Sequence, residues 1–185
     1  MNELFFSFQD SLIPGEEINE LGIKIGGEIQ SMKDATLRGY GDDRASINLP
    51  FDNKAMDRVK EVVKRKKELN PTCLVVAGIG GSIRGTKAVQ EAISGKLRNQ
   101  CDSEMKVLYA CNPDPHTIRD IREIMESVLK KDGEIILNVV SKSGTTTETM
   151  ANFQLLVDLL REHRSDYGRY VVVTTERDSG LWNLG

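Results

Sequence analysis

From residue 71 onward, short apolar runs alternate with longer amphipathic stretches. Each apolar run is rich in β-branched residues, which is typical of a buried strand. These runs predict strands at residues 73–77, 106–110, 134–140 and 170–174. The stretches between them carry apolar side chains three or four positions apart, the spacing of one helix face. Strands that alternate with helices predict a mostly parallel sheet covered on both faces, a three-layer α-β-α sandwich of the α/β class.

The first 50 residues are less regular. Glu16 to Lys33 carry a weak helical period that glycines interrupt. The segment Ile47–Pro50 predicts a short extended piece, because the residue before a proline is biased away from helical backbone. We therefore expect a partly helical N-terminal segment at residues 1–50 and one α/β domain at residues 51–185.

A clear amphipathic helix opens the second part. From Asn53 to Leu69, alanine and valines occupy one face, and lysines and arginines occupy the other. We interpret the basic run as the solvated side of this helix, because no aromatic residues interleave with it as they do in many nucleic-acid sites. Asn70 and Pro71 are expected to end the helix.

Composition and charge exclude several classes of function. The chain has 185 residues, of which 39% are hydrophobic and 29% charged, and its net charge is −3. This balance is ordinary for a globular protein and favours neither nucleic acid nor an acidic membrane as partner. Its apolar runs are too short to span a bilayer, and the N-terminus lacks a secretory pattern. Three cysteines without Cys-x-x-Cys spacing predict reduced thiols in a cytoplasmic protein, and with only two histidines no metal site is expected.

The predicted strand at residues 134–140 runs directly into a turn dense in hydroxyl groups. Residues 141–148 read Ser-Lys-Ser-Gly-Thr-Thr-Thr-Glu, and a helical pattern begins immediately after the glycine. The free N–H groups of a first helical turn attract anions, the hydroxyls are further donors, and Lys142 adds a positive charge. Thr145 and Glu148 have the spacing of a capping box. An ordinary capped strand–helix junction is therefore the alternative to an anion site.

A second candidate turn follows the strand at residues 73–77. It reads Gly-Ile-Gly-Gly-Ser at residues 78–82, with Gly85 after it. The dinucleotide pattern Gly-x-Gly-x-x-Gly is not met, since Ile83 occupies the third glycine position, and no Gly-Lys-Ser/Thr follows as in a nucleotide-triphosphate loop. The glycines permit close backbone approach, and Ser82 lies at a helix start. Because ligands bind beyond the carboxyl ends of parallel strands, the two turns together predict one shared site for a small phosphate.

These two motifs, Gly78–Ser82 with Gly85 and Val140–Glu148, resemble those of the glucose-6-phosphate isomerase family, where they lie in the first sugar isomerase (SIS) domain. Ile47–Pro50 and Asn112 agree with smaller features of that family. The resemblance covers most of the chain from about residue 38. It implies a flavodoxin-like SIS sheet at residues 51–185.

The resemblance also implies which residues hold the phosphate of a sugar substrate. These are Gly81, Ser82, Ser141, Lys142, Ser143, Thr145 and Thr146. Among them, Thr145 is expected to act more as a helix cap than as a direct ligand. The implied reaction interconverts glucose 6-phosphate and fructose 6-phosphate through a cis-enediol, with a carboxylate moving the proton between C2 and C1 and with no cofactor.

The family's catalytic Glu, His, Lys and Arg match no residue of this sequence, and the second SIS domain has no counterpart in it. We therefore expect a chain that binds a sugar phosphate and does not isomerise it alone. We expect it to form a homo-oligomer or to associate with a missing C-terminal part. Two alternatives stay open at this point: a stand-alone SIS-domain sensor of sugar phosphates, and a nucleotide-binding α/β module.

Overall fold

The computed structural model describes residues 7–101 and 104–184. The chain divides into two compact units, residues 1–60 and 61–185, which are described separately. Helix α2 (Asn53–Lys67) has residues in both units; it begins at the same residue as the predicted amphipathic helix and ends two residues earlier.

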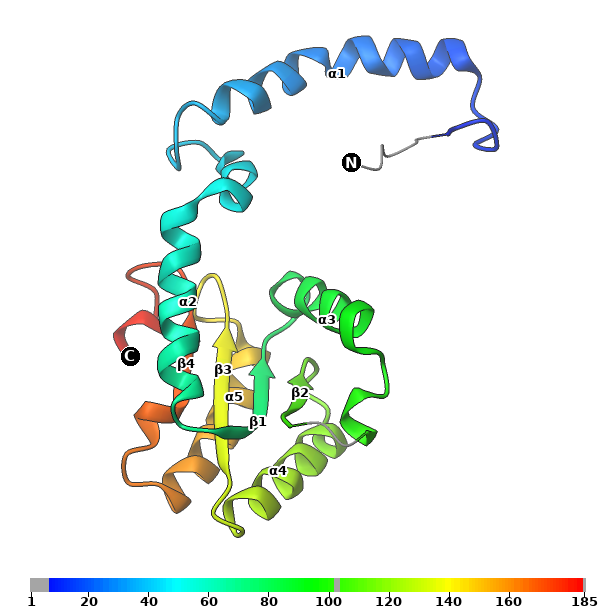
Figure 1. Cartoon of the computed structure of the whole chain (residues 1–185). Coiled ribbons are helices and arrows are strands. Elements are labelled where there is room, and N and C mark those ends of the chain that lie inside the picture. The colour runs from blue at the N-terminus through cyan, green and yellow to red at the C-terminus, as the bar shows by residue number, and fades with distance from the viewer. Residues whose placement is uncertain (1–6, 102–103, 185) are drawn as a thin grey trace. The chain divides into compact units, whose positions relative to one another are not determined.

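The first unit is helical, as predicted (Figure 1). Helix α1 spans Gly15–Ala35, and a 3₁₀ segment, η1, spans Ala45–Phe51. The extended piece predicted at Ile47–Pro50 is wrong, because these residues lie inside η1. The side-chain amide of Asn48 donates to the carbonyl oxygens of Ala35 and Gly39, at 3.2 and 2.8 Å. These longer-range bonds favour the tight turn, and a rule about neighbours in sequence does not detect them.

The second unit is built on a four-stranded sheet in the order β2-β1-β3-β4. The strands are β1 (Pro71–Ala77), β2 (Lys106–Ala110), β3 (Glu134–Val140) and β4 (Val171–Thr174), and every pair is parallel. The predicted parallel α/β sheet is confirmed. Strands β1 and β3 lie at its centre, where burial on both faces explains their nearly continuous apolar sequences.

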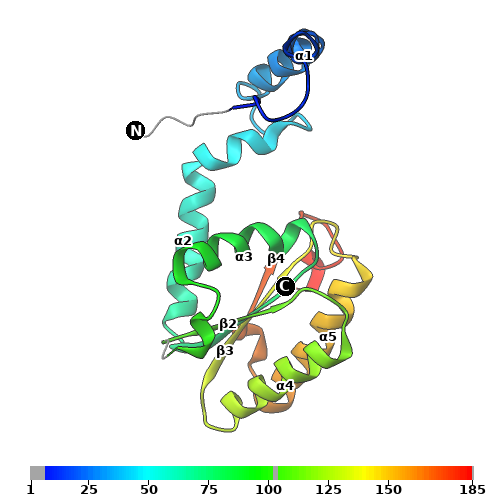
Figure 2. The same cartoon turned by 90° about the vertical axis from the view of Figure 1, so that its right-hand side faces the viewer.

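Helices cover both faces of the sheet (Figure 2). Helix α3 (Gly81–Ser94) lies on one face, and α4 (Pro115–Leu129) and α5 (Thr147–His163) lie on the other. The main core forms between the sheet and this second pair. Val75, Leu137 and Leu156 are fully buried there, and each such side chain contributes about 1.5–3 kcal/mol by leaving water.

Short 3₁₀ segments complete the second unit: η2 (Arg98–Gln100), η3 (Tyr167–Tyr170) and η4 (Trp182–Leu184). Among the described residues, no helix combines the length and apolar character needed to cross a bilayer.

Helix α3 packs much less closely than α5. Ile83 is its single buried residue, whereas Val89 is 59% exposed and Ile93 is 80% exposed. The helix ends at Ser94, because Gly95 adopts a positive φ of 83°. An apolar stripe on α3 is therefore open to solvent in this structure.

Candidate functional site

The order of the strands reverses between β1 and β3. From β1 the chain moves to β2 on one side, then returns past β1 to β3 on the other. In open parallel sheets this is the switch point at which ligands bind, beyond the carboxyl ends of the strands. The turn at residues 78–82, here called the glycine turn, follows β1, and the turn at residues 141–147, here called the hydroxyl turn, follows β3. Ala77 and Val139 are paired near the ends of those two strands. The topology therefore brings both predicted turns to the switch point.

The two turns are in direct contact. A β-carbon placed on Gly78 would lie 2.9 Å from the carbonyl oxygen of Val140 and 3.4 Å from the β-carbon of Ser82. A side chain at position 78 would thus push the two turns apart. The approach depends on glycine for steric reasons, as close backbone approach generally does.

The glycine turn delivers Gly81 and Ser82 to the start of a helix. Gly80 adopts a positive φ of 58°, which glycine accepts without strain. Helix α3 then begins at Gly81. Among the described residues, the backbone N–H of Gly81 donates no hydrogen bond to the protein. Such a group at a helix N-terminus can receive an anion.

In the hydroxyl turn, four of the predicted side chains are paired. The Oγ of Ser141 lies 3.1 Å from the Oγ1 of Thr146 and accepts a bond from the N–H of Gly144. Ser141 is only 2% exposed. The Oγ of Ser143 accepts bonds from both the N–H and the hydroxyl of Thr145, at 3.3 and 3.1 Å. These pairs fold the turn back on itself.

The cap of α5 differs from the prediction. The capping box of Thr145 and Glu148 is wrong, because α5 begins at Thr147 and Thr146 occupies the cap position. No side chain caps the helix: the hydroxyl of Thr146 pairs with Ser141, and that of Thr145 turns to Ser143. Within residues 7–101 and 104–184, the N–H groups of Ser143 and Thr146 donate no bond to the protein. A turn with unfilled N–H groups at a helix start suits an anion better than an ordinary capped junction does.

Lys142 is the cation of the hydroxyl turn. Its side chain is exposed and enters no ion pair within the part of the chain that the structure describes. Helices α3 and α5 both begin at the carboxyl ends of the strands, on opposite faces of the sheet (Figure 2). Their positive dipole ends add to the charge of Lys142.

The segment at residues 179–181, in which no sequence motif indicates a site, also contacts the hydroxyl turn. A β-carbon on Gly144 would lie 2.7 Å from the backbone nitrogen of Leu181 and 2.8 Å from the Oγ of Ser179. Gly144 itself has a positive φ of 66°. The contact joins residues far apart in the chain, so no local pattern could have revealed it.

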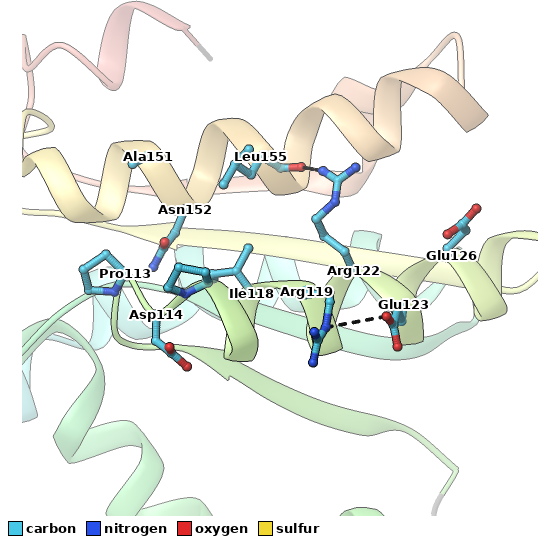
Figure 3. Close-up of a pocket in the computed structure, with 11 residues that line it drawn as sticks. Pro113, Asp114, Ile118, Arg119, Arg122, Glu123, Glu126, Ala151, Asn152 and Leu155 are labelled. Carbon is cyan, nitrogen blue, oxygen red and sulfur yellow. Dashed lines mark hydrogen bonds and ion pairs between the residues drawn. The ribbon is translucent and has the colours of Figure 1, made fainter.

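A pocket also lies elsewhere, between α4 and α5 (Figure 3). It has a volume of about 450 Å³. Its polar groups are already engaged: Arg119 pairs with Glu123, and Arg122 donates to the carbonyl of Leu155. Asp114 caps α4, and the bonds from the side chain and backbone of Thr117 lower the pKa of its carboxyl. The two turns therefore remain the candidate site, in preference to this pocket.

No group of three or more His, Cys, Asp or Glu side chains within the described residues is arranged to hold a metal ion. Cys73 is fully buried in β1, and desolvation raises the pKa of its thiol to about 11. This thiol is therefore a core residue and not a nucleophile.

Comparison with known proteins points to one family. Residues 57–179 match the family model described as Phosphoglucose isomerase. The chain is 28% identical to a glucose-6-phosphate isomerase of Rubrobacter xylanophilus over 98% of this chain and 41% of the relative. It is 33% identical to a glucose-6-phosphate isomerase of Staphylococcus aureus over 72% of this chain and 30% of the relative. The chain thus spans less than half the length of these curated relatives.

Solved structures give the same picture. A hypothetical protein from Thermus thermophilus superposes with a TM-score of 0.65 at 25% identity, covering 90% of this chain and 38% of the other. A glucose-6-phosphate isomerase from Chlamydia trachomatis superposes with a TM-score of 0.57 at 25% identity, covering 81% of this chain and 27% of the other.

Proposed function

The chain belongs to the phosphoglucose isomerase family, and we propose that it is the sugar-phosphate-binding N-terminal part of a glucose-6-phosphate isomerase. One observation carries the proposal: the glycine turn and the hydroxyl turn touch at the switch point, and among the described residues each has at least one unpaired backbone N–H at or near a helix start. A phosphate monoester carries a charge of about −1.5 to −2 and three acceptor oxygens, which such groups can satisfy.

Each predicted residue has a role in this proposal. Gly81 offers its backbone N–H and Ser82 offers its hydroxyl at the start of α3. Ser143 and Thr146 offer N–H groups and hydroxyls from the second turn, Ser141 holds Thr146 in place, and Thr145 orients Ser143. Lys142 balances the charge of the phosphate. We keep residues 51–185 as the proposed extent of the SIS-type domain.

These residues would hold a phosphate without moving a proton. Hydroxyls, amides and one ammonium group are donors, whereas isomerisation requires a carboxylate that carries a proton between two carbon atoms. We infer that the chain contributes binding, and that turnover in glycolysis or gluconeogenesis depends on residues outside this set.

The open stripe on α3 suggests a partner. Val89 and Ile93 are both more than half exposed, although each is apolar. Contiguous exposed apolar surface commonly marks a protein interface. We propose that this stripe contacts a second copy of the chain or the C-terminal part of the family's fold.

The test is thermal unfolding of the chain in the presence of fructose 6-phosphate, 6-phosphogluconate, inorganic phosphate and NAD. A ligand that binds only the folded state raises stability by RT ln(1 + [L]/Kd), about 2.7 kcal/mol at a concentration 100 times Kd. We expect both sugar phosphates to raise the melting temperature and NAD to leave it unchanged. Ser82→Ala should abolish most of the shift, whereas Ser165→Ala, a change in an exposed loop beyond α5, should preserve it.

A shift with NAD and none with sugar phosphates would contradict the proposal and favour a nucleotide-binding module. Neither the matched relatives nor the described part of the chain favours the alternative of a stand-alone sugar-phosphate sensor.

A further inference from the structure

The segment at residues 175–181, which follows β4 and is here called the β4 segment, holds the backbone of the hydroxyl turn at several points. The N–H of Ser141 donates to the carbonyl of Thr174, which continues the β3–β4 pairing into the turn. The N–H of Glu176 donates to the carbonyl oxygen of Lys142 at 3.1 Å. The hydroxyl of Thr175 donates to that same oxygen at 3.3 Å. Both available positions on one carbonyl are thus filled from the β4 side.

The number of hydrogen atoms on each hydroxyl determines which group is the donor in the hydrogen bonds that lead to this carbonyl. The Oγ1 of Thr175 lies 2.7 Å from the Oγ of Ser179, and either could be the donor by geometry. A hydroxyl has one hydrogen, and that of Thr175 is directed to Lys142, so Ser179 must donate to Thr175. Ser179 in turn accepts a bond from the backbone N–H of Trp182 at 3.2 Å. The result is a single chain of bonds from Trp182 through Ser179 and Thr175 to the carbonyl of Lys142.

This chain of bonds orients a donor of the candidate site. The carbonyl of Lys142 and the N–H of Ser143 belong to one planar peptide unit, and none of the described peptide bonds is cis. In a trans peptide the two groups point in opposite directions. A carbonyl held toward the β4 segment therefore directs the N–H of Ser143 away from it. That N–H has no partner among the described residues.

Packing secures the far end of the segment. Leu181 is fully buried in the core cluster, and its backbone nitrogen lies against Gly144. Asp178 turns the backbone with a positive φ of 63°, a conformation that aspartate tolerates better than most residues. The segment is therefore anchored independently of the turn that it supports.

We propose that Thr175 and Ser179 are positioning residues that hold the Ser143 N–H ready for the phosphate of the sugar. The inference rests on the proposed function, since it concerns the same site. Neither residue touches the ligand: Thr175 acts through the Lys142 carbonyl, and Ser179 acts through Thr175. Losing one neutral hydrogen bond of this kind weakens binding by about threefold to tenfold.

The test compares substitutions that remove or keep the hydroxyl. Thr175→Val removes it at nearly constant volume, Thr175→Ser keeps it, and Ser179→Ala removes the second link. Thr72→Val is the matched control, because the hydroxyl of Thr72 also bonds a carbonyl of β3, that of Glu134, at the opposite end of the strands. Calorimetry should show fructose 6-phosphate binding weakened about threefold to tenfold by Thr175→Val and Ser179→Ala, and unchanged by Thr175→Ser and Thr72→Val.

A second readout separates this inference from the proposed function. The ¹⁵N amide resonance of Ser143 in the ligand-free chain should move in Thr175→Val and Ser179→Ala and stay in place in Thr175→Ser and Thr72→Val. If the wild-type chain binds no sugar phosphate, the proposed function fails, and the Ser143 resonance still decides whether the two residues orient this amide. Unchanged affinity in Thr175→Val, or an unmoved Ser143 resonance, would overturn the inference.

Discussion

Gly78, the first residue after β1, and Val140, the last residue of β3, are so close that a β-carbon on Gly78 would lie 2.9 Å from the Val140 carbonyl oxygen. This contact joins the turn after β1 to the turn after β3. It makes a shared phosphate site physically reasonable, because it brings the beginnings of the two turns together. The candidate site therefore depends on how closely two backbones approach, as well as on its side chains.

The approach can be tested with Gly78→Ala. The added methyl group would overpack the junction, and we expect unfolding to become easier by about 1–3 kcal/mol. Fructose 6-phosphate binding should weaken about tenfold or more, because separated turns cannot share one phosphate. Gly85→Ala is the control, since a β-carbon there meets nothing within 4 Å. Because Gly85 lies inside helix α3, Gly85→Ala should stabilise the chain by about 0.5–1 kcal/mol and leave sugar-phosphate binding intact. Equal affinities in the two variants would argue against a shared site.

The anchor of the β4 segment can be tested with Leu181→Ala. Removing a fully buried leucine side chain should cost about 2–5 kcal/mol of unfolding free energy. Because Leu181 lies against Gly144, sugar-phosphate affinity should fall as well. Leu97→Ala, at a residue that is mostly exposed, should change stability by less than about 0.5 kcal/mol. Denaturant titration and calorimetry measure the two effects. A Leu181→Ala chain of normal affinity would show that the segment does not support the site.

The buried thiol of Cys73 makes a prediction about pH. Its pKa is raised by desolvation to about 11, while the thiol of an unfolded chain titrates near its ordinary value of about 8.5. The protonated thiol of Cys73 contributes its full stabilisation of the folded state at pH values below the pKa of the unfolded chain. This stabilisation is lost as the pH rises toward 11. The melting temperature should therefore fall more steeply above about pH 9 in the wild type than in Cys73→Ala. Identical pH slopes would contradict this assignment.

The same burial predicts selective thiol chemistry. At about pH 8 a maleimide reagent should modify exposed Cys101 rapidly and leave Cys73 unmodified until the chain unfolds. Mass spectrometry of the labelled chain measures both sites at once. Rapid labelling of Cys73 in the folded protein would show that β1 opens far more readily than its burial indicates.

The open stripe on α3 predicts association. Ile93→Glu places a charge in this stripe, and we expect it to reduce self-association of the chain, measured by light scattering over a concentration series. Ser94→Glu adds the same charge at the neighbouring exposed residue and should have a smaller effect. Sugar-phosphate binding should be retained in both. If Ser94→Glu disrupts association as strongly as Ile93→Glu, net charge and not the apolar stripe would be responsible.

Much of the architecture could be predicted from local sequence. The bounds of β2 and β3 agree with the predicted strands, because apolar β-branched runs bounded by turn residues have few ways to be buried. The two turns are also marked by their own residues, glycine where the backbone needs a positive φ and hydroxyl groups where a strand passes into a helix.

Other features depend on residues that are distant in sequence. Ile47–Pro50 is helical because Asn48 reaches back to Ala35 and Gly39. The hydroxyl of Thr146 pairs with Ser141 instead of capping α5. Thr175 and Ser179 are ordinary loop residues until β4 pairs with β3 and brings them behind Lys142.

The physical reason is the range of the forces involved. A residue's own side chain and its near neighbours set its preference for burial, for a strand or for a turn, and these preferences can be read along the chain. The identity of the distant group that completes a hydrogen bond or fills a contact is set when the whole sheet packs. For this protein the sequence alone predicts the two turns. Their contact at Gly78 and Val140, and the hydrogen bonds from the β4 segment, form only when the chain folds.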